Sequence, residues 1–135
     1  MDPKATINRL FEAVLNQGRL DLLEELIGPG YRDHNPVPGQ LPGAEGVRRK
    51  LLALRRAFPD IRFHLEDLVG EGDRVAARYY WEGTQQGEFM GISPAGKQVR
   101  VRGMDFYRLE AGKIVEHWDC VDELGLLRQL GVIPP

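Results

Sequence analysis

The spacing of apolar residues along this chain changes at Pro59. Before Pro59, apolar side chains recur at the spacing that places them on one face of an α-helix. After it, they alternate with polar residues, as they do in a strand that buries one face, and the first such set is Ile61, Phe63 and Leu65. Helices followed by strands predict an α+β fold, with N-terminal helices packed on one face of a curved antiparallel sheet.

Glycine, proline and capping residues divide the chain into elements of a single domain, residues 1–135. Asp2-Pro3 is typical of a helix start, and Gly18 of a helix end. Gly28-Pro29-Gly30 is expected to stop a second helix. Helices are thus expected at about residues 3–17, 20–27 and 44–57, strands at about 61–69, 75–81, 88–92, 99–109 and 113–121, and a short last helix after Asp122.

The stretch from Val99 to Val121 is predicted to be a hairpin that turns at Glu110-Ala111-Gly112. A three-residue loop that ends in glycine suits a type I turn followed by a G1 bulge. Such a turn places Leu109 opposite Lys113. This pairing decides which side chains share a face, because opposite residues of an antiparallel pair point the same way.

Three ionisable side chains are expected on one face of this hairpin. Asp105 is predicted to lie opposite His117, and Asp119 follows two residues later on the same face. A carboxylate in apolar surroundings has a raised pKa and can exchange protons near neutral pH. We interpret Asp119 as a candidate acid/base, tuned or oriented by Asp105 and His117; the alternative is an inert ion pair. The rest of the face is apolar, with Val99, Val101, Tyr107, Leu109, Val115 and Val121.

A cavity for a small apolar molecule is expected between this face and the helices, because apolar cavities with a few polar groups are the usual ligand sites. Asn35 or Tyr79 could hydrogen-bond a carbonyl oxygen there. The alternative for His34 and Asn35 is a structural role in their own turn, and for the aromatic residues a place in the core. The residues predicted to bind substrate are His34, Asn35, Phe63, Arg78, Tyr79, Trp81, Phe89, Met90 and Tyr107.

The other face of the hairpin is predicted to carry Met104, Phe106, Ile114, Trp118 and Cys120. An apolar patch of this kind usually marks a surface that another molecule covers. We expect a homodimer through this outer sheet face, centred on Met104, Phe106 and Trp118. The alternative is that the chain's own helices cover it.

Composition and motifs argue against several other functions. A net charge of −2 and a pI near 5.9 provide no basic surface for nucleic acid, and Arg48-Arg49-Lys50 is interpreted as a solvated helix face. The single Cys120 precludes an intrachain disulfide and favours a reducing compartment. The chain has neither an apolar run of membrane-spanning length nor a signal-peptide pattern, so we expect no membrane partner and a cytoplasmic location.

Cofactor chemistry is not expected either. The three histidines lack metal-ligand spacing, and no glycine-rich loop joins a strand to a helix. Ser93, the only serine, lies in a proline- and glycine-rich turn, so a serine hydrolase is not indicated. We therefore expect neither a metal nor an organic cofactor.

Four segments together resemble the SnoaL-like polyketide cyclase (ester cyclase) family, across about residues 5–131. The segments are Tyr31 with Asp33-His34-Asn35-Pro36, Ala57-Phe58-Pro59-Asp60, Gly83-Thr84 with Gly87-Glu88-Phe89-Met90-Gly91-Ile92, and Gly112-Lys113-Ile114-Val115-Glu116-His117-Trp118-Asp119. The resemblance implies the nuclear-transport-factor-2-like (cystatin-like) fold, a cone of helices and bent sheet that encloses a pocket, commonly dimeric or tetrameric.

The resemblance also implies a reaction. In characterised cyclases of this family, an aspartate in the last strand is the acid/base for a cofactor-free intramolecular aldol ring closure, and that position matches Asp119. A histidine that precedes it in the family falls on Asp105 here, and His117 could replace its imidazole. We therefore expect a cofactor-independent cyclase- or isomerase-like enzyme acting on a small apolar carbonyl or ester compound. The alternatives are a related epoxide or ester hydrolase and a non-catalytic binding module for a hydrophobic metabolite.

Overall fold

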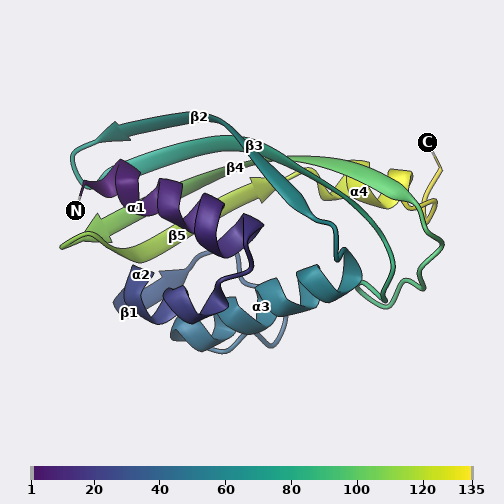
Figure 1. The fold of residues 1–135 in the computed structure, drawn as a ribbon, viewed down its shortest axis with the longest axis horizontal. Coiled ribbons are helices and arrows are strands. Elements are labelled where there is room, and N and C mark those ends of the chain that lie inside the picture. Colours follow the sequence, from purple (N-terminus) through teal and green to yellow (C-terminus); the bar gives the residue numbers. More distant parts are fainter. Residues whose placement is uncertain (1, 135) are drawn as a thin grey trace.

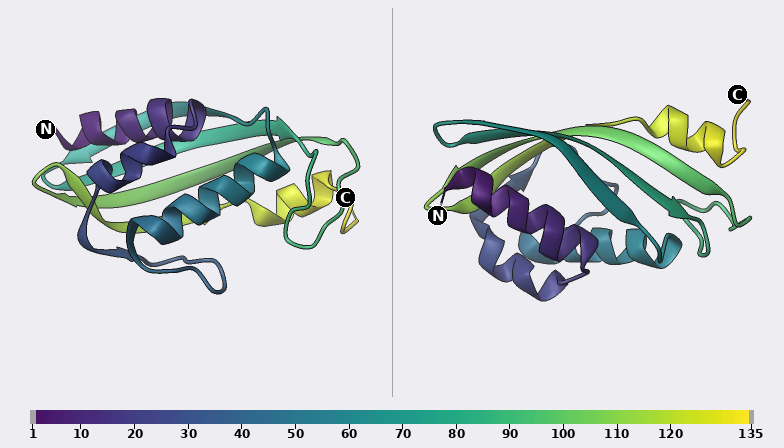
Figure 2. Two further views of the ribbon diagram at one scale, coloured as in Figure 1. Left: turned by 60° about the horizontal axis from the view of Figure 1, so that its bottom comes forward. Right: turned by 45° about the horizontal axis from the view of Figure 1, so that its top comes forward.

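The structure is a computed structural model that describes residues 2–134. A curled sheet arches over the N-terminal helices, and the last helix lies at the far end of the sheet (Figures 1 and 2). The elements are α1 (Pro3–Arg9), η1 (Leu10–Asn16), η2 (Leu20–Leu22), α2 (Leu23–Leu26), β1 (Ile27–Asp33), α3 (Gly43–Ala57), β2 (Arg62–Glu71), β3 (Arg74–Thr84), β4 (Gln98–Glu110), β5 (Lys113–Val121) and α4 (Glu123–Gln129). Within the described residues, no helix is both long and apolar enough to span a bilayer.

The sheet has five strands in the order β1-β5-β4-β3-β2. Strands β2 to β5 form the expected antiparallel meander, whereas β1 pairs with β5 in parallel, so the sheet is mixed. The segment 88–92, expected as a strand, contains only a single bridge between Phe89 and Ile92. The α+β prediction is confirmed, and its wholly antiparallel sheet is corrected by the addition of β1.

Strand β1 begins where the sequence suggested that a helix stops. Gly28, Pro29 and Gly30 lie inside it, and its pairing with β5 is interrupted between Ile27 and Arg32. Proline is tolerated there because β1 is an edge strand, where a missing N–H breaks no ladder on the open side. Asp33 is paired with His117 by this strand. The parallel edge therefore brings the motif at residues 31–36 to the last strand of the chain.

The core lies between the concave face of the sheet and the helices. Phe11 of η1 packs edge-on against Phe63 and Tyr79, and Phe58, after α3, packs edge-on against Trp81. Burying each large apolar side chain contributes roughly 1.5–3 kcal/mol, so this contact holds the helices under the sheet. The apolar side chains that meet here include Ile7, Val14, Leu23, Leu26, Val75, Val101, Leu109 and Ile114.

The hairpin between β4 and β5 turns more tightly than the sequence suggested. Glu110 pairs with Lys113, so the loop has two residues, Ala111 and Gly112, with φ angles of 51° and 76°. Two positive φ angles are typical of a type I′ turn, which matches the twist of the flanking strands. The expected pairing of Leu109 with Lys113 is therefore wrong by one residue.

A β-bulge at Val115 restores the predicted faces beyond the turn. Leu109 pairs with Ile114 but Arg108 pairs with Glu116, so Val115 is the extra residue. Ile114 consequently lies in the core, 3% exposed, and not on the outer face as expected. Past the bulge the side chains return to the predicted sides of the sheet.

Candidate functional site

The predicted ionisable residues meet on the concave face, with altered pairing. Asp105 lies directly opposite Asp119, and Tyr107 lies opposite His117. The sequence had placed Asp105 opposite His117. Because the combined offset of turn and bulge is even, all three ionisable groups still point to one face. Their side chains are between 10% and 19% exposed.

Asp105 is held by two phenols. The Tyr79 hydroxyl donates to its Oδ1 at 3.0 Å, and the Tyr107 hydroxyl donates to its Oδ2 at 2.8 Å. Tyr79 reaches Asp105 over Gly103, where an added Cβ would lie 2.5 Å from the Tyr79 hydroxyl oxygen. Burial comes first, and the Asp105 charge second, among the causes that raise the pKa of both phenols. Both therefore remain protonated donors that fix Asp105.

His117 lies between two carboxylates. Its Nε2 is 3.3 Å from Asp105 Oδ2, and its Nδ1 is 3.6 Å from Asp33 Oδ1. The Nε2 contact is an ion pair and not an aligned hydrogen bond. Burial opposes a positive charge here, but Asp105 and Asp33 outweigh it and raise the pKa of His117 to about 9. The imidazole is therefore a cation at neutral pH, stacked on Tyr107 at 4.9 Å.

Asp33, at the end of β1, completes this cluster. It accepts hydrogen bonds from the Asn35 backbone N–H at 3.0 Å and from Gln40 Nε2 at 3.0 Å. Burial tends to raise the pKa of Asp33, but the nearby His117 imidazolium and the hydrogen bonds from Asn35 and Gln40 lower it well below the usual range. Asp33 was not among the predicted site residues; its place in the motif at 31–36 was the available signal.

Asp119 is the carboxylate of the cluster with the fewest fixed partners. Its side chain is 19% exposed, and within residues 2–134 its one ion pair, at 3.8 Å, is with Lys50 Nζ of α3. Asn35 Oδ1 accepts the backbone N–H of Asp119 at 2.9 Å and holds this part of β5. Burial raises the pKa of Asp119, while the nearby charges of Lys50 and His117 oppose the rise.

Tyr31 is a further member that the sequence analysis did not assign. It lies two residues before Asp33 in β1, and so on the same side of that strand. Burial raises the pKa of its phenol, and Asp33, Asp105 and Asp119 raise it further. Tyr31 is therefore a protonated phenol that faces three carboxylates.

The remaining predicted binding residues are spread over three environments. Asn35, Tyr79 and Tyr107 belong to the cluster through the contacts given above. Phe63 and Trp81 are buried in the core, and Phe89 packs on Phe58 at 5.4 Å. Met90 is 67% exposed, so it lies away from any enclosed site.

Two of the predicted binding residues lie on the convex face. Arg78 forms ion pairs with Glu66 and Asp67. His34 stacks on Trp118 at 4.3 Å, and its Nε2 is 2.7 Å from a Glu116 carboxylate oxygen. The expectation that Arg78 and His34 line the inner site is corrected: Arg78 points to the convex side of β3, and His34, just after β1, packs on the convex-face side chains of Trp118 and Glu116.

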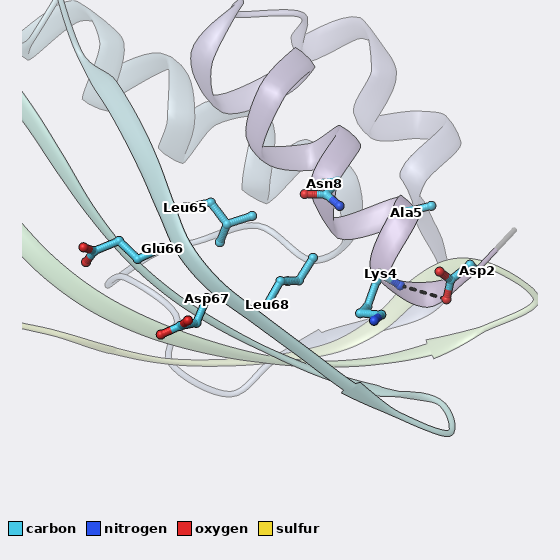
Figure 3. Close-up of a pocket in the computed structure, with 8 residues that line it drawn as sticks. All are labelled: Asp2, Lys4, Ala5, Asn8, Leu65, Glu66, Asp67 and Leu68. Carbon is cyan, nitrogen blue, oxygen red and sulfur yellow. Dashed lines mark hydrogen bonds between the residues drawn. The ribbon is translucent and has the colours of Figure 1, made fainter.

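Surface grooves lie at two places among the described residues that bear on the predicted site and its surroundings. One, of about 490 Å³, lies between α1 and β2 and is lined by polar residues and leucines, among them Lys4, Asn8, Leu65 and Asp67 (Figure 3). The other, of about 360 Å³, runs across the sheet among Met104, Phe106, Trp118 and Cys120. The enclosed cavity expected on the helix side stays a prediction.

A metal ion could be approached by three of the clustered groups. Asp33, His117 and Asp119 each offer one ligand atom, and these atoms lie within 4.8 Å of one another. However, a protonated imidazole has no lone pair for a metal, and Lys50 adds a second positive charge beside Asp119. The groups as arranged form an internal ion-pair cluster.

Comparison with known proteins identifies the family of the chain. The family model for SnoaL-like polyketide cyclase matches residues 5–130. The chain belongs to the SnoaL-like polyketide cyclase family. Aklanonic acid methyl ester cyclase DauD of Streptomyces sp. (strain C5) is 31% identical over 97% of this chain and 83% of its own. The corresponding cyclase DnrD of Streptomyces peucetius is 33% identical over 93% of this chain and 88% of its own.

Solved structures of the same SnoaL/NTF2-like fold superpose closely on this SnoaL-family chain. TsrD from Streptomyces laurentii gives a TM-score of 0.86 at 36% identity, covering 96% of this chain and 97% of TsrD. A SnoaL-like polyketide cyclase from Agrobacterium tumefaciens gives 0.79 at 29% identity, covering 97% and 100%. The resemblance expected from the four sequence segments is confirmed.

Proposed function

We propose that this chain is a cofactor-independent, cyclase-type enzyme in which Asp119 is the general acid/base for a small apolar carbonyl or ester compound. The observation that carries the proposal is a carboxylate with few partners beside a fixed ion-paired cluster. Asp105 and Asp33 are each held by two hydrogen bonds, whereas the Asp119 carboxylate has, among the described residues, only the 3.8 Å contact with Lys50. Burial raises the pKa of Asp119, which makes its carboxylate a stronger base.

The proposed reaction is an intramolecular aldol closure. Asp119 takes a proton from a carbon next to a carbonyl group, and the electron pair of that C–H bond becomes an enolate. The enolate carbon attacks a second carbonyl carbon of the same molecule, forming a C–C bond and an alkoxide. Protonated Asp119 returns the proton to the alkoxide, so atoms and charge balance without a cofactor.

His117, Asp33 and Asp105 are proposed as positioning residues. The two carboxylates keep the imidazole charged, and the imidazolium limits the rise in the pKa of Asp119. The family resemblance places a histidine at position 105, and here β5 supplies an imidazole next to that position. We propose that His117 takes over its electrostatic role.

Ring closure is favoured over hydrolysis by the state of Asp105. A hydrolase would need Asp105 and Asp119 to activate a water molecule together. Both oxygens of Asp105 already accept phenol hydrogen bonds, and Oδ2 also faces His117. The names of two relatives, cyclases of aklanonic acid methyl ester, also support that ester as the first compound to assay.

The experiment is the Asp119→Asn variant, assayed with aklanonic acid methyl ester and by deuterium exchange at carbon acids of related keto esters. We expect turnover and exchange to fall by a factor of about 10²–10⁴, the usual contribution of a general base. Folding should be retained, because Asn35 binds the Asp119 backbone and not its side chain. Asp73→Asn, at an exposed turn between β2 and β3, is the matched control. Unchanged exchange in Asp119→Asn would contradict the proposal.

We also propose that a second copy of the chain covers the convex face of the sheet. Met104 is 58% exposed and Phe106 is 39% exposed, and both border the groove beside Trp118. Contact between these exposed apolar side chains and water is unfavourable, and an isologous dimer would bury the same patch on both copies.

A further inference from the structure

The proposed ring closure leaves a negative charge that needs a partner. An enolate forms on a carbonyl oxygen when the α-proton leaves, and enzymes stabilise such oxygens with donors or cations fixed in advance. Asn35 and Tyr79 were the donors expected from the sequence. The Asn35 carbonyl oxygen accepts from the Asp119 backbone, and the Tyr79 hydroxyl donates to Asp105. The Tyr79 hydroxyl is thus already used, whereas the Asn35 NH₂ group can still donate as a neutral group. A cation beside it would stabilise the enolate oxygen more strongly than a neutral donor alone.

Lys50 has the geometry for this task. It lies on α3, three residues after Val47 and four before Leu54, so it borders the partly buried apolar stripe of that helix. Arg48 and Arg49, its neighbours in the basic run, are bound by Glu45 on the same helix. Lys50 instead extends to the sheet, 30% exposed, with Nζ 3.8 Å from Asp119 Oδ2.

The ammonium group of Lys50 has unused hydrogen-bonding capacity. An ammonium carries three N–H donors. Between residues 2 and 134, the only partner found for Lys50 is Asp119, at a distance longer than a hydrogen bond. A ligand oxygen beside Asp119 would therefore meet a cation whose donors are free.

We propose that Lys50 is a second catalytic residue, which binds the oxygen of the substrate on which the enolate charge develops. The inference rests on the proposed function. Before proton transfer, Lys50 faces the Asp119 carboxylate. When Asp119 takes the proton and becomes neutral, the negative charge moves to the enolate oxygen, and the same ammonium can follow it without losing a proton. This interaction strengthens as the reaction proceeds, which is the condition for catalysis.

The proposal narrows the substrate class. The carbonyl oxygen of the substrate must lie within reach of Lys50, and the neighbouring α-carbon within reach of Asp119. The reacting unit is therefore a ketone or ester whose carbonyl oxygen points toward α3. Compounds in which a second carbonyl group is attached to the same α-carbon would form the most stable enolate. A β-diketone or β-keto ester unit is therefore the expected recognition element.

A binding experiment separates this role from activity. The probe is 4-nitrophenol near neutral pH, whose phenolate imitates an enolate and is followed by its absorbance. We expect Lys50→Met to weaken phenolate binding about tenfold, less than the roughly 10²–10³ for loss of an oxyanion-hole donor, because Lys50 is partly exposed. Lys50→Arg should retain most of the affinity. Arg49→Met, a neighbouring cation 64% exposed, should change it less than twofold.

A second measurement tests the coupling with Asp119. In Lys50→Met, the pKa of the Asp119 carboxyl, followed by ¹³C NMR, should rise, because the opposing cation is gone while burial remains. His117, Asp105, Asp33 and Tyr31 also face Asp119 and are unchanged in this comparison. An unchanged pKa would contradict the coupling between Lys50 and Asp119, whereas the phenolate affinity tests whether Lys50 also binds a ligand oxygen.

The outcomes distinguish the two proposals. Equal phenolate affinity in the wild type and Lys50→Met, including no measurable binding by either, overturns the role of Lys50. Turnover lost in Asp119→Asn but unchanged in Lys50→Met likewise removes Lys50 and leaves the acid/base proposal standing. Turnover retained in Asp119→Asn contradicts the acid/base proposal itself.

Discussion

Because His117 is charged in the folded protein, the protein should lose stability as the pH becomes alkaline. The pKa of His117 rises from an ordinary 6.5 to about 9 in the folded protein, because Asp105 and Asp33 hold the imidazolium against the cost of burial. When the pKa of a group is higher in the folded than in the unfolded chain, its full stabilising contribution is present at pH values below the pKa of the unfolded chain. This stabilisation is lost as the pH rises through the pKa of the group in the folded protein. A difference of this size corresponds to about 3 kcal/mol.

Urea unfolding between about pH 6 and pH 10 measures this contribution. We expect the free energy of unfolding of the wild type to fall by about 3 kcal/mol over that range, mostly between pH 6.5 and 9. His117→Gln should be less stable at neutral pH, because two buried carboxylates lose their cation, and its stability should be nearly independent of pH over this range.

The control is His64→Gln. His64 is 31% exposed and pairs with Glu82 on the outer side of β2, so this variant should keep the wild-type slope. A wild-type slope that persists in His117→Gln, or stability that increases toward alkaline pH in the wild type, would refute the reasoning.

Two further variants test contacts described above. Gly103→Ala should cost about 1–3 kcal/mol by overpacking, because the new Cβ would lie 2.5 Å from the Tyr79 hydroxyl, and Tyr79→Phe in the same chain should recover part of it in urea unfolding. Phe106→Asp should convert the proposed dimer to a monomer in light scattering, while Leu124→Asp, at an exposed position of α4, should not; a monomeric wild type would contradict the dimer.

The change of apolar spacing at Pro59 was enough to predict most of the fold. Helical spacing identified α1, η1 and α3, and alternation identified β2 to β5, because both signals are local and depend on which face is buried. The grouping of Asp105, His117 and Asp119 was also correct, although their pairing was not. An even error in register leaves every side chain on its predicted face.

The parts of the site that were missed depend on distant pairing. Asp33 and Tyr31 reach the cluster because β1 pairs with β5 in parallel. This contact joins segments that are far apart in the sequence, so no local pattern shows it. The Gly28-Pro29-Gly30 segment suggested a helix stop, and it lies in an irregular edge strand. Lys50 was grouped with Arg48 and Arg49, because helix periodicity does not show whether a charged residue at the edge of the apolar face points to solvent or extends to a neighbouring sheet.

The bulge at Val115 has a consequence for any change in the length of this hairpin. Since side chains alternate along a strand, deleting Val115 would reverse the orientation of everything after it. His117 and Asp119 would then face the solvent, and Trp118 would be turned toward the helices. One residue with no reactive group of its own therefore decides whether the acid and the imidazole are inside or outside the molecule.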